Sequence, residues 1–327
     1  MKPRSVTGSK SGCLLLCMPL LVFPEQRDRH SPIPYVMHKF AGKGHLQRCN
    51  SPIMTSPFQF NVKTKYILKA TLFCIVFIGL HIAFSFFKSA VPAKYERLAH
   101  GLLGTIAAIL VTFIFLKIDR KSFADIGLIL EKNTPIKFLT GVLMGIVLMG
   151  LSVLSIVYFS DFTIEINTNS SVLHFLFLTL PLIPLAFMEE VGFRGYSLSI
   201  LKDKTGIRNS IIVTSTLFAL AHIAYGWTIQ NSFLGAGVWG ILYGLAAIYS
   251  NGISMPTGLH YAANLTTSAF GVSNNSFNIW TLKQKNGGTL ENYQSSEMMT
   301  LIPQFALLAF SIICLEWYLR KRNTPTR

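Results

Sequence analysis

The residues best suited to chemistry stand at the end of a long apolar run. Residues 188–196 read MEEVGFRGY and follow the segment FLFLTLPLIPLAF. An ionisable side chain at mid-bilayer costs about 2.5–3.5 kcal/mol even on lenient insertion scales, so it needs internal partners or a water-filled cavity. Glu189, Glu190 and Arg194 therefore indicate either a structural ion pair or a reactive site.

Helical spacing separates the two glutamates. Glu190 and Arg194 are four residues apart and face each other on a helix, so they can form an ion pair. Glu189 is rotated by about 100° from Glu190 and points to a different surface. In one interpretation, both carboxylates serve only to neutralise the arginine. In the other, Glu190 does so and Glu189 faces a cavity, where it can act as a general base.

Two further polar pairs lie on apolar helices. Phe218 and His222 in STLFALAHIAYG, and His260 and Asn264 in GLHYAANL, are each one helical turn apart. Either histidine alone would more often be a packed, hydrogen-bonded residue than a catalyst. Three polar clusters that must all avoid lipid are most simply placed in one interior site. A carboxylate base, two imidazoles and an amide could there activate water and hold an oxyanion.

Other conspicuous residues are assigned to packing. Three more histidines fall in or near apolar runs as isolated polar residues, and we interpret them as interfacial or packing residues: His81, His100 and His174. Small residues on one helix face let backbones approach closely. This pattern predicts close helix contacts at Gly141 and Gly145, and at Gly237, Gly240 and Gly244.

The composition points to a membrane protein. The chain of 327 residues is 51% hydrophobic and 13% charged, with a mean hydropathy of +0.46, whereas soluble domains carry about twice that charged fraction. Apolar runs of spanning length recur from residue 66 onward. We predict an all-α polytopic membrane protein of about eight transmembrane helices. They lie at residues 66–87, 98–118, 136–160, 172–196, 209–226, 234–250, 254–272 and 300–319.

Basic residues predict how these helices are oriented. Ten of the 29 Lys and Arg residues lie in the first 65 positions, and most others cluster in short loops, such as 117–137 and 197–208, and in the tail. Such clusters mark the cytoplasmic side, which places both termini there. The basic loop at 88–97 is the exception. The net charge of +15 therefore reflects topology, and we expect no nucleic-acid partner.

The three motifs, taken in order, resemble a known family. EEVGFR matches Glu-Glu-x-x-x-Arg, FALAH matches Phe-x-x-x-His and HYAAN matches His-x-x-x-Asn. This series resembles the CPBP intramembrane proteases, which include type II CaaX prenyl endopeptidases and Abi-type bacteriocin self-immunity proteins. The resemblance implies a bundle of about eight spans around a cytoplasm-facing catalytic cavity.

The resemblance also implies a role for each motif residue. Glu189 would activate the attacking water together with His222. His260 and Asn264 would stabilise the tetrahedral oxyanion. Glu190 and Arg194 would orient the site.

The resemblance leaves the metal open, because two histidines and a glutamate are compatible with zinc. A zinc ion would be bound by Glu189, His222 and His260. However, the chain has no HExxH motif, and the amide of Asn264 is a poor zinc ligand but a good oxyanion donor. These features favour a metal-free glutamate mechanism over a zinc mechanism.

The expected domain organisation has two parts. Residues 1–60 are basic and predict a disordered extension, with Met54 as a plausible true start. Residues 61–327 form the expected membrane protease domain, with its motifs in 186–264. We expect an integral protein of the bacterial inner (plasma) membrane.

The leading hypothesis is an intramembrane endopeptidase whose partners are the lipid bilayer and a membrane-associated peptide or protein substrate. One alternative is a non-enzymatic bacteriocin-immunity or membrane binding protein. A proton-coupled transporter ranks last, since no inverted-repeat hydropathy is present.

Overall fold

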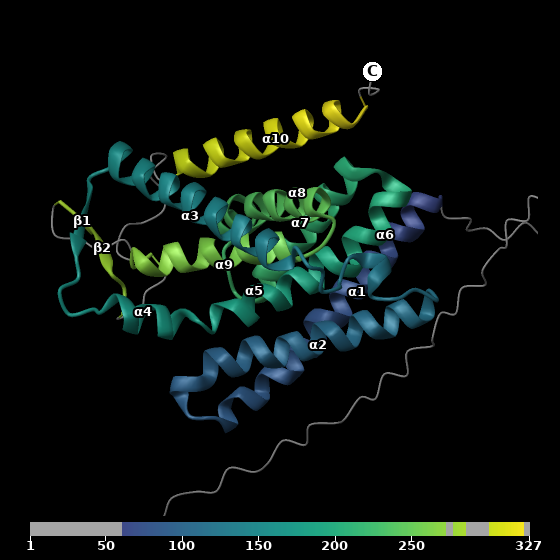
Figure 1. The fold of residues 1–327 in the computed structure, drawn as a ribbon, viewed down its shortest axis with the longest axis horizontal. Coiled ribbons are helices and arrows are strands. Elements are labelled where there is room, and N and C mark those ends of the chain that lie inside the picture. Colours follow the sequence, from purple (N-terminus) through teal and green to yellow (C-terminus); the bar gives the residue numbers. More distant parts are fainter. Residues whose placement is uncertain (1–60, 273–276, 286–300, 324–327) are drawn as a thin grey trace, which may run out of the picture. The chain divides into compact units, whose positions relative to one another are not determined.

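The computed structural model describes residues 61–272, 277–285 and 301–323. The predicted N-terminal extension, residues 1–60, lies outside them. Helices dominate the described residues (Figure 1). Seven helical stretches in the described residues are long and apolar enough to cross a membrane, which confirms the all-α polytopic fold class.

Six of these stretches correspond to one predicted span each. Their main helices are α1 (Val62–Ser85), α2 (Glu96–Ile118), α3 (Thr134–Phe159), α7 (Ile207–Ala224), α8 (Val238–Ser250) and α10 (Ile302–Asn323). The connections contain short 3₁₀ turns: η1 (Phe86–Ala90), η2 (Ala93–Tyr95) and η3 (Ala124–Ile126). A π-helical segment, η5 (Asn231–Gly237), leads into α8. Large apolar side chains remain exposed along α1, α2 and α3, as expected of helices that face lipid.

The seventh stretch is interrupted at Pro181 and again directly after Glu190. It contains α4 (Val172–Thr179), α5 (Leu182–Glu190), the π-helical segment η4 (Val191–Gly195) and α6 (Tyr196–Thr205). Pro181 stands at the N-cap of α5, and because proline has no backbone N–H it cannot continue the helix from α4. The π-helical turn begins directly after Glu190, and such turns are frequent at functional sites.

The remaining predicted span, 254–272, differs from the expectation. It forms α9 (Ser254–Ala269), whose 16 residues fall short of the roughly 20 that a spanning helix needs. Most of its residues are buried, and it packs against α3, α5 and α8. The helix that carries the third motif is therefore an inner helix of the bundle.

Glycines allow α3 and α9 to touch, as predicted for Gly141 and Gly145. A Cβ at Gly141 would overlap the carbonyl oxygen of Met255, and one at Gly145 would overlap that of Leu259. Gly258 of α9 contacts the α3 backbone in the same way. A side chain larger than hydrogen at these positions would push the two helices apart, so the glycines determine how closely α9 packs against α3.

A pair of short strands follows the far ends of α3 and α9. Strand β1 (Phe162–Ile166) pairs antiparallel with β2 (Trp280–Gln284), with Ile164 opposite Leu282. Phe162 and Leu282 are buried there together with Val153 of α3. This two-stranded sheet therefore joins the segments that follow α3 and α9, outside the helices.

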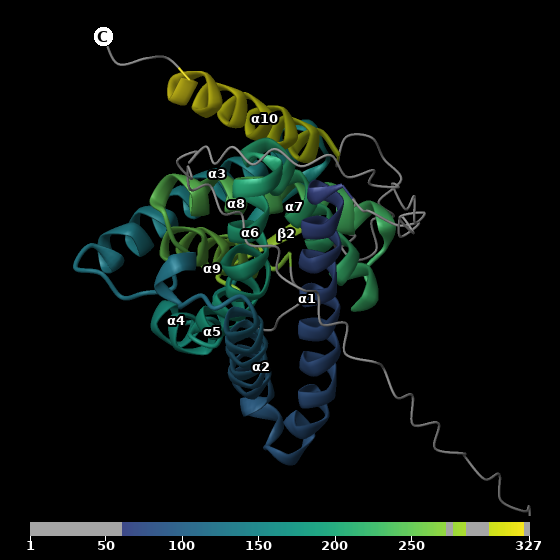
Figure 2. The same ribbon diagram turned by 90° about the vertical axis from the view of Figure 1, so that its right-hand side faces the viewer.

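Aromatic side chains fill the core between α1, α2 and the motif-bearing helices. Figure 2 shows α1 and α2 side by side, and the two helices are in contact. Phe77 of α1 packs edge-on against Phe193, and Phe193 against Phe218 of α7. This core fixes α5 and α7 relative to each other.

Candidate active site

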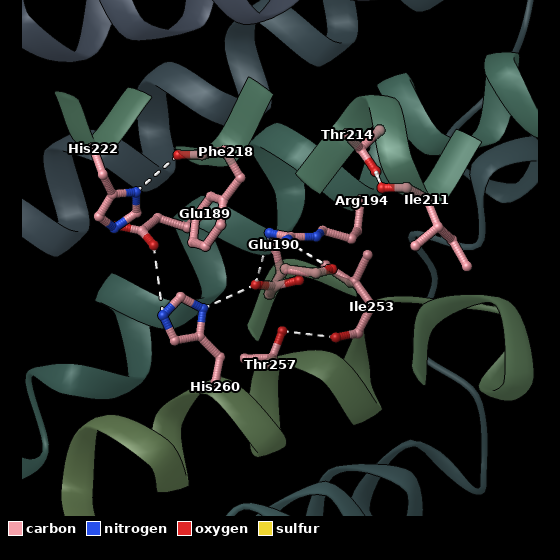
Figure 3. A network of polar contacts seen from close by, with 11 residues as sticks. Glu189, Glu190, Arg194, Ile211, Thr214, Phe218, His222, Ile253, Thr257 and His260 are labelled. Atoms are coloured by element: carbon pink, nitrogen blue, oxygen red, sulfur yellow. Dashed lines mark hydrogen bonds and ion pairs between the residues drawn. The ribbon is translucent and has the colours of Figure 1, made fainter. Parts of the chain in front are cut away.

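Three helices bring the predicted residues together (Figure 3). Glu189 and Glu190 end α5, His222 lies in the last turn of α7, and His260 lies in the middle of α9. Figure 3 shows the Glu189 carboxylate between the two imidazole rings, with Glu190 and Arg194 on the other side of His260. The site is therefore built from segments that are far apart in the sequence.

Glu190 is fully buried and accepts two charge-assisted hydrogen bonds on one oxygen. Its Oε1 lies 3.3 Å from Arg194 Nη1 and 2.9 Å from His260 Nδ1. The ion pair with Arg194 is the one that the spacing predicts. Among the described residues, Glu190 Oε2 has no hydrogen-bond partner although it is buried.

Arg194 is anchored by more than its carboxylate. Its Nη2 donates to the carbonyl oxygen of Gly240 at 3.2 Å, and its guanidinium lies 4.3 Å from the ring centre of Phe218. A Cβ at Gly240 would lie only 3.0 Å from Nη2, so the missing side chain makes room for the arginine. The glycine spacing predicted a helix contact at Gly240, but not that its carbonyl would bind Arg194.

His260 connects the two glutamates. Its Nδ1–H donates to Glu190, and its Nε2 lies 3.5 Å from Glu189 Oε2. The ring stacks on Tyr243 of α8, with centroids 4.5 Å apart and an angle of 15°. Glu189 therefore has His260 as a neighbour, whereas the helical spacing gave a partner only to Glu190. The missed contact joins residues some seventy positions apart, and local spacing carries no signal for it.

These contacts bring two carboxylates, a guanidinium and an imidazole together. Both carboxylates face His260, and one of them also faces Arg194. An imidazole beside a carboxylate is an arrangement that acid–base chemistry can use.

His222 presents one ring nitrogen to this set. Its Nδ1 lies 2.9 Å from the carbonyl oxygen of Phe218, and since a carbonyl only accepts, Nδ1 carries a hydrogen. In the neutral ring Nε2 is then free to accept a proton, and Figure 3 shows it on the side of Glu189. Trp227 packs edge-on against the ring, with centroids 4.6 Å apart.

Asn264 lies one helical turn after His260 on α9 and is partly exposed. Its place on the helix matches the expected spacing. Whether it donates to an oxyanion stays a prediction.

The zinc alternative requires Glu189, His222 and His260 to converge on one point. Within the described residues, no group of three or more His, Cys, Asp or Glu side chains is arranged to hold a metal ion. The residues as arranged therefore do not fit a zinc site, and we derive no step through a metal.

Two histidines that the sequence suggested to be isolated are not. His81 and His100 lie with ring centroids 4.5 Å apart, and His81 Nδ1 lies 2.8 Å from the hydroxyl of Tyr225. The sequence missed this cluster because its members come from α1, α2 and the end of α7. The third histidine, His174, is exposed on α4.

Comparison with known proteins agrees with the motif order. Residues 170–266 match the family model described as type II CAAX prenyl endopeptidase Rce1-like. No curated protein matches the chain. The matched segment contains all three motifs and runs from just before α4 to the last turn of α9. It bears out the resemblance predicted from those motifs, since this part of the chain is similar to a type II CAAX prenyl endopeptidase Rce1-like domain.

Proposed function

We propose that this chain is an intramembrane endopeptidase that hydrolyses a peptide bond in a membrane-associated peptide or protein. The observation that carries the proposal is the position of Glu189. Its carboxylate lies between imidazoles contributed by two other helices, 3.5 Å from His260 and on the Nε2 side of His222. A water held at this carboxylate would have a base on one side and a proton donor on the other.

The reaction begins with this water. Glu189 takes one proton of the water and His222 Nε2 accepts a hydrogen bond from the other O–H, while the oxygen attacks the carbonyl carbon of the scissile bond. The Nδ1–H bond to Phe218 keeps the His222 ring in the tautomer that can accept. The carbonyl oxygen then becomes an oxyanion, for which His260 Nε2–H and the Asn264 amide are the donors.

The second step breaks the carbon–nitrogen bond. The proton taken from water passes to the leaving amine, which also takes up the second proton of the water, so the products are a carboxylate and a protonated amine. Glu190 and Arg194 do not touch the reacting atoms in this scheme. They hold His260 through its Nδ1 and balance its charge.

Substitution of Glu189 by Gln tests the proposal. The first probe is a farnesylated peptide with a C-terminal CaaX sequence in proteoliposomes, beside its non-prenylated form, with product release measured by mass spectrometry. Because general acid–base groups contribute about 10²- to 10⁴-fold, Glu189→Gln should lower the cleavage rate by that factor. Glu165→Gln is the matched control, since Glu165 is exposed in β1 and pairs with Lys283.

Full cleavage by Glu189→Gln would overturn the proposed mechanism. The alternative, a binding protein that protects against a membrane-active peptide, gives the opposite pattern: both Glu189→Gln and His222→Ala should then protect as well as the wild type.

Chelation separates the two chemical mechanisms. Under the metal-free scheme, cleavage should survive dialysis against a strong zinc chelator with its rate unchanged. Loss of cleavage that added Zn²⁺ restores would favour the zinc mechanism instead.

We place the protein in the bacterial inner membrane with both termini in the cytoplasm. The basic loops support this orientation. It requires an even number of crossings, so the short α9 would have to cross together with the seven longer stretches. Seven crossings would place the two termini on opposite sides. Reporter fusions after residue 323 and within 160–171 should report opposite sides of the membrane.

A further inference from the structure

A second polar cluster lies beside the site, and none of its members belongs to the three motifs. His81 of α1 is 1% exposed, its ring centroid lies 4.5 Å from that of His100 on α2, and its Nδ1 lies 2.8 Å from the hydroxyl of Tyr225. Ionisable side chains in apolar helices are costly, so they are usually paired or serve a function. His81 Nε2 and His100 Nδ1 are buried and without hydrogen-bond partners within the described ranges, which adds to this cost.

The bond from His81 holds the end of α7. Tyr225 caps this helix three residues after His222 and donates its backbone N–H to Ala221. Two residues later, the N–H of Trp227 bonds the carbonyl oxygen of His222. The rings of Tyr225 and Trp227 both stand edge-on to His222, at centroid distances of 6.4 and 4.6 Å. Fixing the Tyr225 ring therefore fixes one wall around the His222 imidazole.

His81 and Met188 approach the same glycine of α2. The point where a Cβ at Gly104 would stand is 3.0 Å from His81 Nε2 and overlaps Met188 Sδ. Met188 directly precedes Glu189 on α5 and is buried. Both side chains therefore use the space that the missing side chain of Gly104 leaves.

We propose that His81 is a positioning residue for His222, acting through Tyr225. The inference rests on the proposed function. His100 supports the His81 ring from α2, so α1 and α2, two of the helices that precede the matched segment, contribute to the geometry of the site.

The state of Tyr225 fits this role. Burial raises the pKa of its phenol, and the negative charge of Glu189 raises it further. Tyr225 therefore keeps its O–H at working pH and can donate it to His81 Nδ1.

A double-mutant cycle tests the pair. His81→Phe and Tyr225→Phe should each lower kcat for the farnesylated peptide by about 10- to 100-fold, because misplaced catalytic groups cost about that much. KM should change by less than about threefold, since binding is not the function of the pair. The double variant should lose no more than the worse single variant, because both remove one hydrogen bond.

Matched controls exclude a general effect of removing polar rings. His174→Phe and Tyr249→Phe alter exposed residues on α4 and α8 and should leave both kinetic constants unchanged. Losses of His81→Phe and Tyr225→Phe that multiply in the double variant, or that fall on KM alone, would overturn the inference.

A spectroscopic readout keeps this inference separate from the proposed function. In ¹⁵N-histidine NMR of the detergent-solubilised protein, the His81 resonance, assigned by its loss in His81→Phe, should shift in Tyr225→Phe. If Glu189→Gln is inactive but His81→Phe is fully active, the positioning role is wrong and the proposed function stands. If Glu189→Gln is active, the proposed function fails, and so does the catalytic meaning of the His81 contact.

Discussion

Glu189 and Glu190 are neighbours in the chain, yet they lie in two different regions of the site. Glu190 is buried completely, accepts from Arg194 and His260 and faces the core. The side chain of Glu189 is 15% exposed and lies between the two motif histidines, His222 and His260. The first region resembles a structural ion pair, and the second resembles a reaction centre.

The difference shows how one dipeptide can serve both purposes. A carboxylate that accepts from a guanidinium and an imidazole is held in one geometry. Its neighbour on the next helix face keeps a single long contact to His260, so it remains free to bind water. His260 touches both, which makes the rigidity of the Glu190 region useful to the Glu189 region.

The largest expected effect separates the two glutamates by stability. Glu190→Gln leaves the Arg194 charge buried without its counter-ion and should lower the free energy of unfolding by about 3–5 kcal/mol. Glu189→Gln should change it by less than about 1 kcal/mol, since no buried charge depends on it alone. Thermal unfolding in detergent micelles measures both.

Equal losses in the two variants would contradict the division of roles. A paired change sharpens it further: Glu190→Leu with Arg194→Met removes both charges and should recover most of the lost stability. The same double variant should stay inactive, because His260 then loses the acceptor at Nδ1.

The next effect concerns the shape of the cation. Arg194→Lys keeps the charge but cannot reach Glu190 and Gly240 together, as the guanidinium does. We expect a loss of about 2 kcal/mol, the value of one charged hydrogen bond. Chemical denaturation in a series of mild detergents measures this loss in the free energy of unfolding. If Arg194→Lys were as stable as the wild type, only the charge at this position would matter.

The third effect tests the room that Gly240 leaves. The added methyl group of Gly240→Ala would stand 3.0 Å from Arg194 Nη2 and 3.2 Å from the Ser215 backbone. Overpacking of this kind costs about 1–3 kcal/mol. Gly235→Ala is the control, since its nearest atom lies 4.0 Å away. A loss of the same size in both variants would contradict the proposed steric role of Gly240.

The smallest effect concerns the ring beneath the guanidinium. Phe218 lies 4.3 Å from Arg194 by its ring centre, a geometry worth about 1–2 kcal/mol when desolvated. A double-mutant cycle of Phe218→Leu with Arg194→Met should give a coupling free energy at the lower end of this range, about 1 kcal/mol. A coupling near zero would mean that Phe218 serves only packing and the His222 bond.

Much of this protein was determined by local pattern. Apolar runs longer than a bilayer is thick predicted the spanning helices, and a spacing of four residues predicted the Glu190–Arg194 pair. Both rest on helical periodicity, which acts within a few residues of chain. The order of the three motifs likewise predicted the family of residues 170–266.

The contacts that make the site specific were decided by the tertiary structure. His260 reaches Glu190 across 70 positions, Arg194 reaches the Gly240 carbonyl across 46, and His81 reaches Tyr225 across 144. Each depends on which helix faces meet, and the glycine contacts that set those faces leave only a weak trace in sequence. The sequence therefore determined which residues could react, and the packing of distant helices decided which of them stand together.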